Sequence, residues 1–159
     1  MAKKFRGVVS SRNMVNSSLI KAAGSLFYSA STHRYMFLLR SSDRYSDTWG
    51  IVGGKVEGDE SIVDCLRRET FEELGDTVPD IIKTIPIDLF ISPDTRFEYH
   101  TFVCVVEREF IPNLNHEHKG YCWTALDGLP KPLHPGLFNA MNMDELKAKF
   151  KSISEKVWL

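Results

Sequence analysis

Three glutamates at helical spacing are the first feature of this sequence that could do chemistry. Glu69, Glu72 and Glu73 lie within the stretch RRETFEELG, residues 67–75. Like charges one helical turn apart repel, at a cost of about 0.2–0.5 kcal/mol per pair. A divalent cation such as Mg²⁺ or Mn²⁺ relieves this repulsion, because hard cations prefer oxygen ligands. We therefore interpret the stretch as an oxygen-ligand metal site; a solvated acidic helix face is the simpler alternative.

The helix that must position these carboxylates has both of its ends marked in the sequence. Ser61 is a good N-cap residue, and Asp64 three positions later completes a capping box. Gly75 supplies the C-terminal stop. We therefore expect a helix over residues 61–74. Its core-facing stripe, taken from residues at 3–4 spacing, is predicted to be Val63, Leu66, Thr70 and Leu74.

A pair of glycines precedes this helix in the chain. Gly53 and Gly54 close the short apolar stretch WGIVGG, residues 49–54. Glycine permits backbone turns that other residues resist, and it lets a ligand or a metal ion come close to main-chain carbonyls. The pair therefore predicts a close backbone approach next to the acidic helix.

Taken together, the stretch GKVEGDESIVDCLRRETFEELG, residues 54–75, closely resembles the Nudix box, the signature of the Nudix hydrolase family. That signature reads Gly, five residues, Glu, seven residues, Arg-Glu, two residues, Glu-Glu, one residue, Gly. The matching letters, all at the family spacing, are Gly54, Glu60, Arg68, Glu69, Glu72, Glu73 and Gly75. Such a match is far more specific than a lone glycine-rich loop. Thr70 and Asp76 depart from the usual aliphatic residues, which concerns packing near the helix end and not the carboxylates.

The resemblance implies a fold and an activity. The fold would be the Nudix fold, of the α/β (α+β) class, in which a mixed β-sheet sandwich is flanked by helices. The activity would be hydrolysis of a diphosphate bond in a nucleoside diphosphate linked to a moiety X, by metal-activated water with Mg²⁺ or Mn²⁺ as cofactor. Divalent ions neutralise the diphosphate, stabilise the leaving oxygen and lower the pKa of a bound water.

The resemblance also implies a role for each residue of the box. The implied metal ligands are Glu69, Glu72, Glu73 and the carbonyl oxygen of Gly54. Glu69, Glu72 and Arg68 are also counted among the catalytic residues. Glu60 would support the site by hydrogen bonds, and Arg68, one turn before Glu72, would orient a glutamate. Gly75 would have a structural role at the helix end.

The catalytic base in this family is not always in the box, and a loop before a late strand with a tryptophan can supply it. The stretch NHEHKGYCW, residues 115–123, resembles that loop and contains Glu117 and His118. Glu117 is our first choice, because a carboxylate can also bind metal. His118 is favoured if the pH profile shows a group near neutral pH. The alternative is that both are exposed polar residues of a loop.

Further residues outside the box are candidates for substrate binding. Arg40, Arg44 and Arg96 are candidates for contacts with phosphates. Phe97 and Tyr99 are candidates for stacking on a base. The alternative for each is an ordinary surface or core position.

The rest of the chain supplies strands on both sides of the acidic helix. Apolar runs and alternation predict strands at 19–29, 34–40, 49–54, 81–91, 97–107 and 121–126, and an amphipathic helix at 137–153. Pro86 predicts an edge or a bulge for the strand that contains it. This order argues for a mixed α/β sandwich and against a regular βαβ array. We expect a single hydrolase domain over 19–159 after a flexible basic arm over 1–18.

Composition and charge argue against several classes of protein. The net charge of −1 gives no global attraction to nucleic acid or acidic lipid, although residues 1–42 carry seven basic and no acidic side chains. No run approaches the ~20 apolar residues of a membrane span. Cys65, Cys104 and Cys122 have neither zinc-site spacing nor the number for a disulfide framework. A reducing cytoplasm is therefore the expected location.

The substrate and the assembly stay open at this level. Candidate substrates are nucleotide sugars, ADP-ribose, dinucleoside polyphosphates, dinucleotide cofactors, oxidised nucleoside triphosphates and the 5′ end of RNA. Small nucleotides are favoured, because no long basic and aromatic surface marks an RNA path, while the basic segment keeps RNA ends as an alternative. A Nudix-fold regulator that binds nucleotide without cleaving it is the rival class, and the intact glutamates argue against it. Pairing of subunits is common in the family, so a homodimer is a further open expectation.

Overall fold

Residues 19–159 are described by the structure, a computed structural model of the chain, and the predicted basic arm over 1–18 lies outside them. Strands and helices alternate irregularly along these residues. The strands are β1 (Ile20–Ser29), β2 (Arg34–Arg40), β3 (Trp49–Gly50), β4 (Val52–Lys55), β5 (Ile81–Ile91), β6 (Phe97–Val106) and β7 (His118–Thr124). The helices are α2 (Ile62–Leu74), α3 (Pro135–Met141) and α4 (Asp144–Glu155), with short 3₁₀ turns at Gly75–Thr77 and Leu126–Gly128.

The strands form one mixed sheet with β1 near its centre. The main order is β3-β2-β1-β6-β5, while β4 pairs with β1 and β7 pairs with β2. β1 runs parallel to β6, and every other pairing is antiparallel. Pro86 lies in β5, the edge strand, next to a register shift, which confirms the prediction of an edge or a bulge.

One edge of β1 is shared between two strands. Its first half pairs with β4, from Ala22 opposite Lys55 to Ser25 opposite Val52. Its last residues, Tyr28 and Ser29, pair with β2 instead. Because one strand edge can hydrogen-bond to only one neighbour at each level, β2 and β4 diverge from one another. The divergence separates β4 from the β2–β7 pair, and Glu69 and Glu73 of α2 lie against the β4 side.

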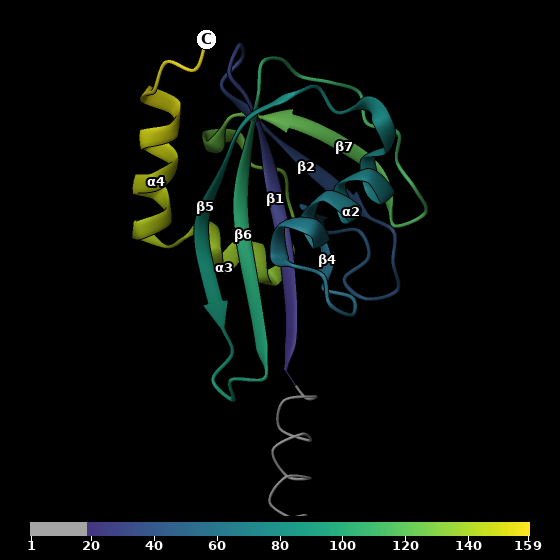
Figure 1. Cartoon of the computed structure of the whole chain (residues 1–159). Helices are drawn as coiled ribbons and strands as arrows, with labels where there is room; N and C mark the ends of the chain where they lie inside the picture. The colour runs from purple at the N-terminus through teal and green to yellow at the C-terminus, as the bar shows by residue number, and fades with distance from the viewer. Residues whose placement is uncertain (1–18) are drawn as a thin grey trace, which may run out of the picture.

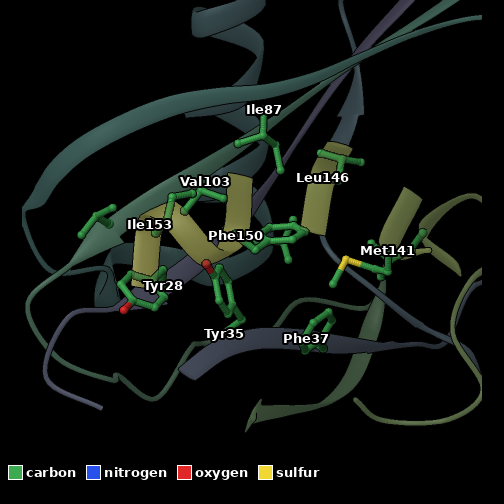
Figure 2. Close-up of a cluster of buried hydrophobic side chains, with 12 residues drawn as sticks. Tyr28, Tyr35, Phe37, Ile87, Val103, Met141, Leu146, Phe150 and Ile153 are labelled. Carbon is green, nitrogen blue, oxygen red and sulfur yellow. The ribbon is translucent and has the colours of Figure 1, made fainter. Parts of the chain in front are cut away.

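Helices cover both faces of the sheet. Figure 1 shows α2 in front of the sheet and α3 behind it, with α4 along the side of β5. The α2 side is packed by Ala23, Phe27, Met36, Leu38, Val52, Cys65, Leu66, Leu74, Cys104, Val106 and Phe110. On the other side, residues of α3 and α4 such as Met141 and Phe150 meet Tyr28, Tyr35 and Phe37 of the sheet (Figure 2). The predicted sandwich with flanking helices is confirmed.

The buried stripe of α2 differs from the predicted one. Val63 is 45% exposed and Thr70 is only partly buried, so the predicted stripe was wrong at these positions. Leu66 and Leu74 are buried as predicted, together with Cys65, Glu69 and Glu73. The stripe is rotated because two carboxylates of the helix face the sheet. A prediction from the spacing of apolar residues could not find this stripe, because such a prediction treats glutamate as a solvent-facing residue.

Three predicted elements have different bounds in the structure. The C-terminal helix predicted at 137–153 is two helices, because the chain turns at Asn142 and is extended at Met143. The strand predicted at 49–54 is interrupted between β3 and β4, since β3 pairs with β2 and β4 pairs with β1. The strand predicted at 121–126 begins earlier, at His118, which pairs with Arg40. Within residues 19–159 no helix is long and apolar enough to cross a membrane.

Phe150 anchors α4 to the sheet, with its ring 5.5 Å from the ring of Tyr35. We expect Phe150→Ala to lower the free energy of unfolding by about 3–5 kcal/mol, because it removes a buried ring and leaves a cavity. Urea denaturation followed by circular dichroism measures the change. Val157→Ala truncates an exposed side chain and should change the same quantity by less than about 0.5 kcal/mol. Equal effects of the two substitutions would contradict the packing described for α4.

Candidate active site

Helix α2 begins and ends where the sequence predicts. The hydroxyl of Ser61 accepts a hydrogen bond from the amide of Asp64 at 3.1 Å. At the other end Gly75 has a φ of 70°, a left-handed conformation that favours glycine, and its amide donates to the carbonyl of Phe71. Both ends of the helix are therefore fixed by local contacts.

Three carboxylates meet between α2 and the start of β7. Glu69 and Glu73 come from α2, and Glu117 immediately precedes β7. One carboxylate oxygen from each lies within 4.8 Å of the other two. Glu69 and Glu73 are buried, and Glu117 is half-buried. Glu72 stands apart from them, with its side chain 49% exposed. We call Glu69, Glu73 and Glu117 the carboxylate cluster.

Arg68 joins the acidic residues around the cluster. Its guanidinium donates two hydrogen bonds to Glu60, at 2.7 and 2.9 Å. The same group reaches Glu69 at 2.9 Å and Glu72 at 3.2 Å, and it donates to the carbonyl of Lys55 at 3.0 Å. Such a planar fork holds several acceptors in one geometry. The hydrogen bonds from Arg68 also hold the pKa of Glu60 below its usual range.

The backbone of β4 lies directly against the carboxylates. The amide of Gly53 donates to an oxygen of Glu73 at 3.0 Å. A Cβ atom placed on Gly54 would collide with the carboxylate of Glu69. A Cβ atom on Gly53 would meet the backbone of Gly24 at 2.8 Å. The glycine pair is therefore required by space, as the sequence suggested.

Burial shapes the electrostatics of the cluster. Glu73, 2% exposed, has its pKa raised to about 9, first by burial and next by the negative charge of Glu117. The hydrogen bond from Gly53 opposes this shift but is outweighed. Burial also raises the pKa of Glu69, against the pull of Arg68. Without a cation, the cluster therefore carries less negative charge at neutral pH than its sequence suggests.

His118 is a buried neighbour of the cluster and not an exposed loop residue. Its Nδ1 lies 3.6 Å from an oxygen of Glu73 and has no hydrogen-bond partner among the described residues. Burial, with a smaller contribution from the charge of Arg40, lowers the pKa of His118 to about 4. The side chain is therefore neutral at physiological pH.

The other predicted site residues lie at different places around the cluster. Arg40 ends β2, and its guanidinium donates to Ser42 at 3.0 Å and to the carbonyl of Arg44 at 3.2 Å. The hydroxyl of Tyr99 faces Gly53, 2.8 Å from the position of a Cβ there. Phe97 packs against Tyr99, with ring centroids 6.2 Å apart, while Arg96 is exposed at the turn before β6.

The contacts that tie the loop 41–48 to the start of β7 were missed by sequence reasoning. Ser41 donates through its amide to the carbonyl of Glu117 at 2.9 Å, and its hydroxyl donates to the carbonyl of His116. Lys119 forms an ion pair with Asp47 of the same loop. The polar character of the loop was visible in the sequence, but these contacts join residues more than 70 positions apart. Spacing along the chain carries no signal for them.

Comparison with known proteins fits this geometry. A family model described as the NUDIX domain matches residues 19–142. The chain is 32% identical over 116 residues to dihydroneopterin triphosphate diphosphatase of Haemophilus influenzae, covering 63% of this chain and 70% of that protein. It is 30% identical over 107 residues to nucleoside triphosphatase NudI of Escherichia coli, covering 60% of this chain and 75% of that protein.

A solved structure of a MutT protein has a similar fold. The MutT protein of Methanosarcina mazei matches with a TM-score of 0.55 and 26% identity, covering 87% of this chain and 96% of that chain. Since the family model also spans most of the residues, this chain belongs to the Nudix family and is a Nudix hydrolase. The predicted family, fold and enzyme class are confirmed.

Burial of Glu73 should make the cation-free protein less stable as the pH rises. The pKa of this group is about 9 in the folded protein against an ordinary value of 4.5, so between these values only the folded state keeps the proton. Its stabilising contribution is therefore complete below about pH 4.5 and is lost as the pH rises towards 9. Glu73→Gln cannot ionise and can still accept the Gly53 amide, so it should remove this decline.

Thermal melts in EDTA between about pH 7 and about pH 9 measure this difference. The exposed Glu72→Gln is the control and should follow the wild-type pH dependence. A decline that persisted in Glu73→Gln would contradict the assignment to Glu73.

For the hydrolysis rate, the planar geometry of the Arg68 guanidinium should matter more than its positive charge. We expect Arg68→Lys to lower the hydrolysis rate by about 10–100-fold, the range found when a group that supports metal ligands is changed. A lysine ammonium cannot hold Glu60 and Glu69 together in one plane. The neighbouring Arg67, which is exposed, supplies the matched control Arg67→Lys, and that variant should keep the wild-type rate. Equal rates for both variants would show that the fork is dispensable.

Proposed function

We propose that this Nudix hydrolase cleaves a phosphoanhydride bond of a small triphosphate, a nucleoside triphosphate or a close analogue, to a monophosphate and diphosphate. The observation that carries the proposal is the carboxylate cluster, which holds ligand oxygens of Glu69, Glu73 and Glu117 within 4.8 Å of one another. The names of two relatives support the substrate class, since one specifies dihydroneopterin triphosphate and the other nucleoside triphosphates.

A divalent cation, Mg²⁺ or Mn²⁺, fits the chemistry of the cluster. The donors are all oxygens, the set that these hard cations prefer. The raised pKa of Glu73 reflects buried like charges, a situation that a cation relieves. We assign Glu69, Glu73 and Glu117 as ligands, with Glu72 and the carbonyl of Gly54 as further ligands. When bound, the cation would neutralise the phosphates and lower the pKa of the attacking water.

The residues of the chain would orient the substrate and accept the proton. Arg68 holds Glu60 and Glu69 in place through its guanidinium. We propose Glu117 as the base, accepting a proton at a carboxylate oxygen, because it is half-buried within the cluster. His118 is the weaker candidate, since a pKa lowered to about 4 makes a poor proton acceptor near neutral pH.

Positively charged side chains outside the cluster would bind the phosphates. Arg40 lowers the pKa of His118 and interacts with Tyr99, so its charge acts on both sides of the site. We propose Arg40 and Arg44 as phosphate ligands, and the exposed Arg96 as a further one. Phe97 and Tyr99 remain candidates for stacking on a base, since alternate residues of a strand share one face.

The wider setting also follows as a proposal. We propose a single hydrolase domain over residues 19–159 that works in the cytoplasm, where its three free cysteines stay reduced. RNA 5′ ends remain the less favoured substrate, supported only by the basic segment 1–42. Assembly into a homodimer is likewise a proposal, which sedimentation of the purified protein tests.

A substrate panel tests the proposed reaction. Nucleoside triphosphates, dihydroneopterin triphosphate, nucleotide sugars, ADP-ribose, dinucleoside polyphosphates and 5′-triphosphorylated RNA are incubated with Mg²⁺ or Mn²⁺, and the products are identified by mass. We expect a monophosphate and diphosphate from a small triphosphate, and no reaction in EDTA. Turnover of only the diphosphate-linked or RNA substrates would contradict the substrate class.

Variants of the acidic residues test the assigned roles. We expect Glu72→Gln and Glu73→Gln each to lower kcat by about 100-fold or more, because loss of a ligand exceeds loss of a supporting group. Circular dichroism should show both variants folded. Near-normal rates in both would overturn the ligand assignment.

A further inference from the structure

An aromatic and cationic stack joins the loop between β2 and β3 to the residue before α3, outside the residues assigned above to the cation. The guanidinium carbon of Arg44 lies 5.3 Å from the centroid of the Tyr45 ring. The ring of His134, just before α3, approaches the same tyrosine edge-on, with centroids 4.6 Å apart and planes at 73°. Tyr45 is 41% exposed, so part of its ring is free for another contact. We call Arg44, Tyr45 and His134 the loop stack.

The backbone holds Tyr45 in a costly conformation. Its φ is 56°, and that of Asp47 is 62°, in the left-handed region that non-glycine residues rarely adopt. The amide of Asp47 donates to the carbonyl of Arg40 at 2.9 Å, and the hydroxyl of Thr48 donates to the carbonyl of Tyr45 at 2.7 Å. Such strain persists only where the surroundings over-determine it, and it concentrates at functional sites.

His134 is also fixed in place. Its Nδ1 accepts the amide of Gly136 at 3.1 Å, and its own amide donates to the carbonyl of Trp49 at 2.8 Å. Burial lowers the pKa of its imidazole, and the charges of Arg40 and Arg44 lower it further. The ring is therefore neutral at physiological pH and can pack against an uncharged heterocycle.

Arg40 connects the loop stack to the carboxylate cluster. Its guanidinium donates to the carbonyl of Arg44, and Arg40 pairs across β2 and β7 with His118, which lies beside Glu73. Its Nε is buried without a hydrogen-bond partner in the described part of the chain. A chain of phosphates could thus run along Arg40 from the loop stack to the cluster, with positive charge beside it.

We propose that Tyr45 and His134 bind the planar nitrogen heterocycle of the substrate, while Arg44 and Arg40 meet its phosphates. The inference rests on the proposed function and deepens it, because it places the ring at the opposite end of the phosphate chain from the cluster. Purine and pterin rings share the flat, polarisable face that aromatic side chains bind. The loop stack is therefore a determinant of substrate specificity and not of the chemical step.

Equilibrium binding separates the ring from the phosphates. Isothermal titration of the metal-free protein compares GTP, ATP and dihydroneopterin triphosphate with inorganic tripolyphosphate, which has no ring. The dissociation constant of each ring-bearing probe is divided by that of tripolyphosphate. This ratio isolates the contribution of the ring to binding, and no turnover is required. For the wild type we expect at least one ring-bearing probe to bind about tenfold or more tightly than tripolyphosphate, the size of one stacking contact.

The variants then locate that contribution. Tyr45→Leu should abolish the difference between the ring-bearing probe and tripolyphosphate, and Tyr45→Phe should keep it, because the phenyl ring retains the stacking face. Phe71→Leu makes the same kind of change at an exposed position of α2 and is the matched control. Phe97→Leu tests the other candidate stacking surface. Steady-state assays should show a raised KM in Tyr45→Leu with kcat within about twofold.

Each outcome bears on the inference separately from the proposed function. Loss of the ring contribution in Phe97→Leu but not in Tyr45→Leu would overturn the inference, as would equal binding of all probes to the wild type. Either result would leave the proposed hydrolysis standing if the substrate panel gives monophosphate and diphosphate. Conversely, a ring contribution that depends on Tyr45 in a protein without triphosphate turnover would sustain the binding site and refute the proposed reaction.

Discussion

Two glutamate carboxylates buried against the backbone of β4 set the conditions for the rest of the site. Burying a carboxylate is costly unless hydrogen bonds or opposite charges compensate for the lost water. Glu73 accepts a hydrogen bond from the amide of Gly53, and Glu69 accepts one from the guanidinium of Arg68. Gly54 must lack a side chain so that Glu69 fits. The spacing of the Nudix box therefore reflects the packing of Gly54, Glu69 and Glu73 and the hydrogen bonds of Arg68.

This unit lies where β1 changes its pairing partner along its length. Where β1 pairs with β4, the paired glycines face α2 at close range, and where it pairs with β2, that strand leads towards β7. Glu117, just before β7, lies next to Glu69 and Glu73 and completes the cluster on the side away from α2. The site is therefore built from one local motif and one distant residue, both positioned by the same division of the sheet.

The sequence was most informative where the geometry is local. The ends of α2 and the close approach of the glycine pair follow from patterns within residues 53–75, and the structure has them as expected. Prediction failed where tertiary contacts override the local pattern. The buried stripe of α2 includes Glu69 and Glu73 because Arg68 and the Gly53 amide of β4 donate hydrogen bonds to them. Strand β7 starts at His118 because Arg40 pairs with it. The ion pair of Lys119 with Asp47 has no counterpart in any local pattern.

The parallel pairing of β1 with β6 has a consequence for how the protein folds. It joins Ile20 to Phe97, which are 97 − 20 = 77 positions apart, whereas the β5–β6 hairpin joins near neighbours. The chain loses conformational entropy when a long loop closes, before the contacts that compensate for this loss have formed. Pairings between distant residues therefore form slowly and late. The β5–β6 hairpin and α2 are local and can form earlier, yet β4 reaches its final place only on an ordered β1. We therefore expect catalytic competence to arise in the last step of folding, so that a nascent or partly folded chain holds no working site.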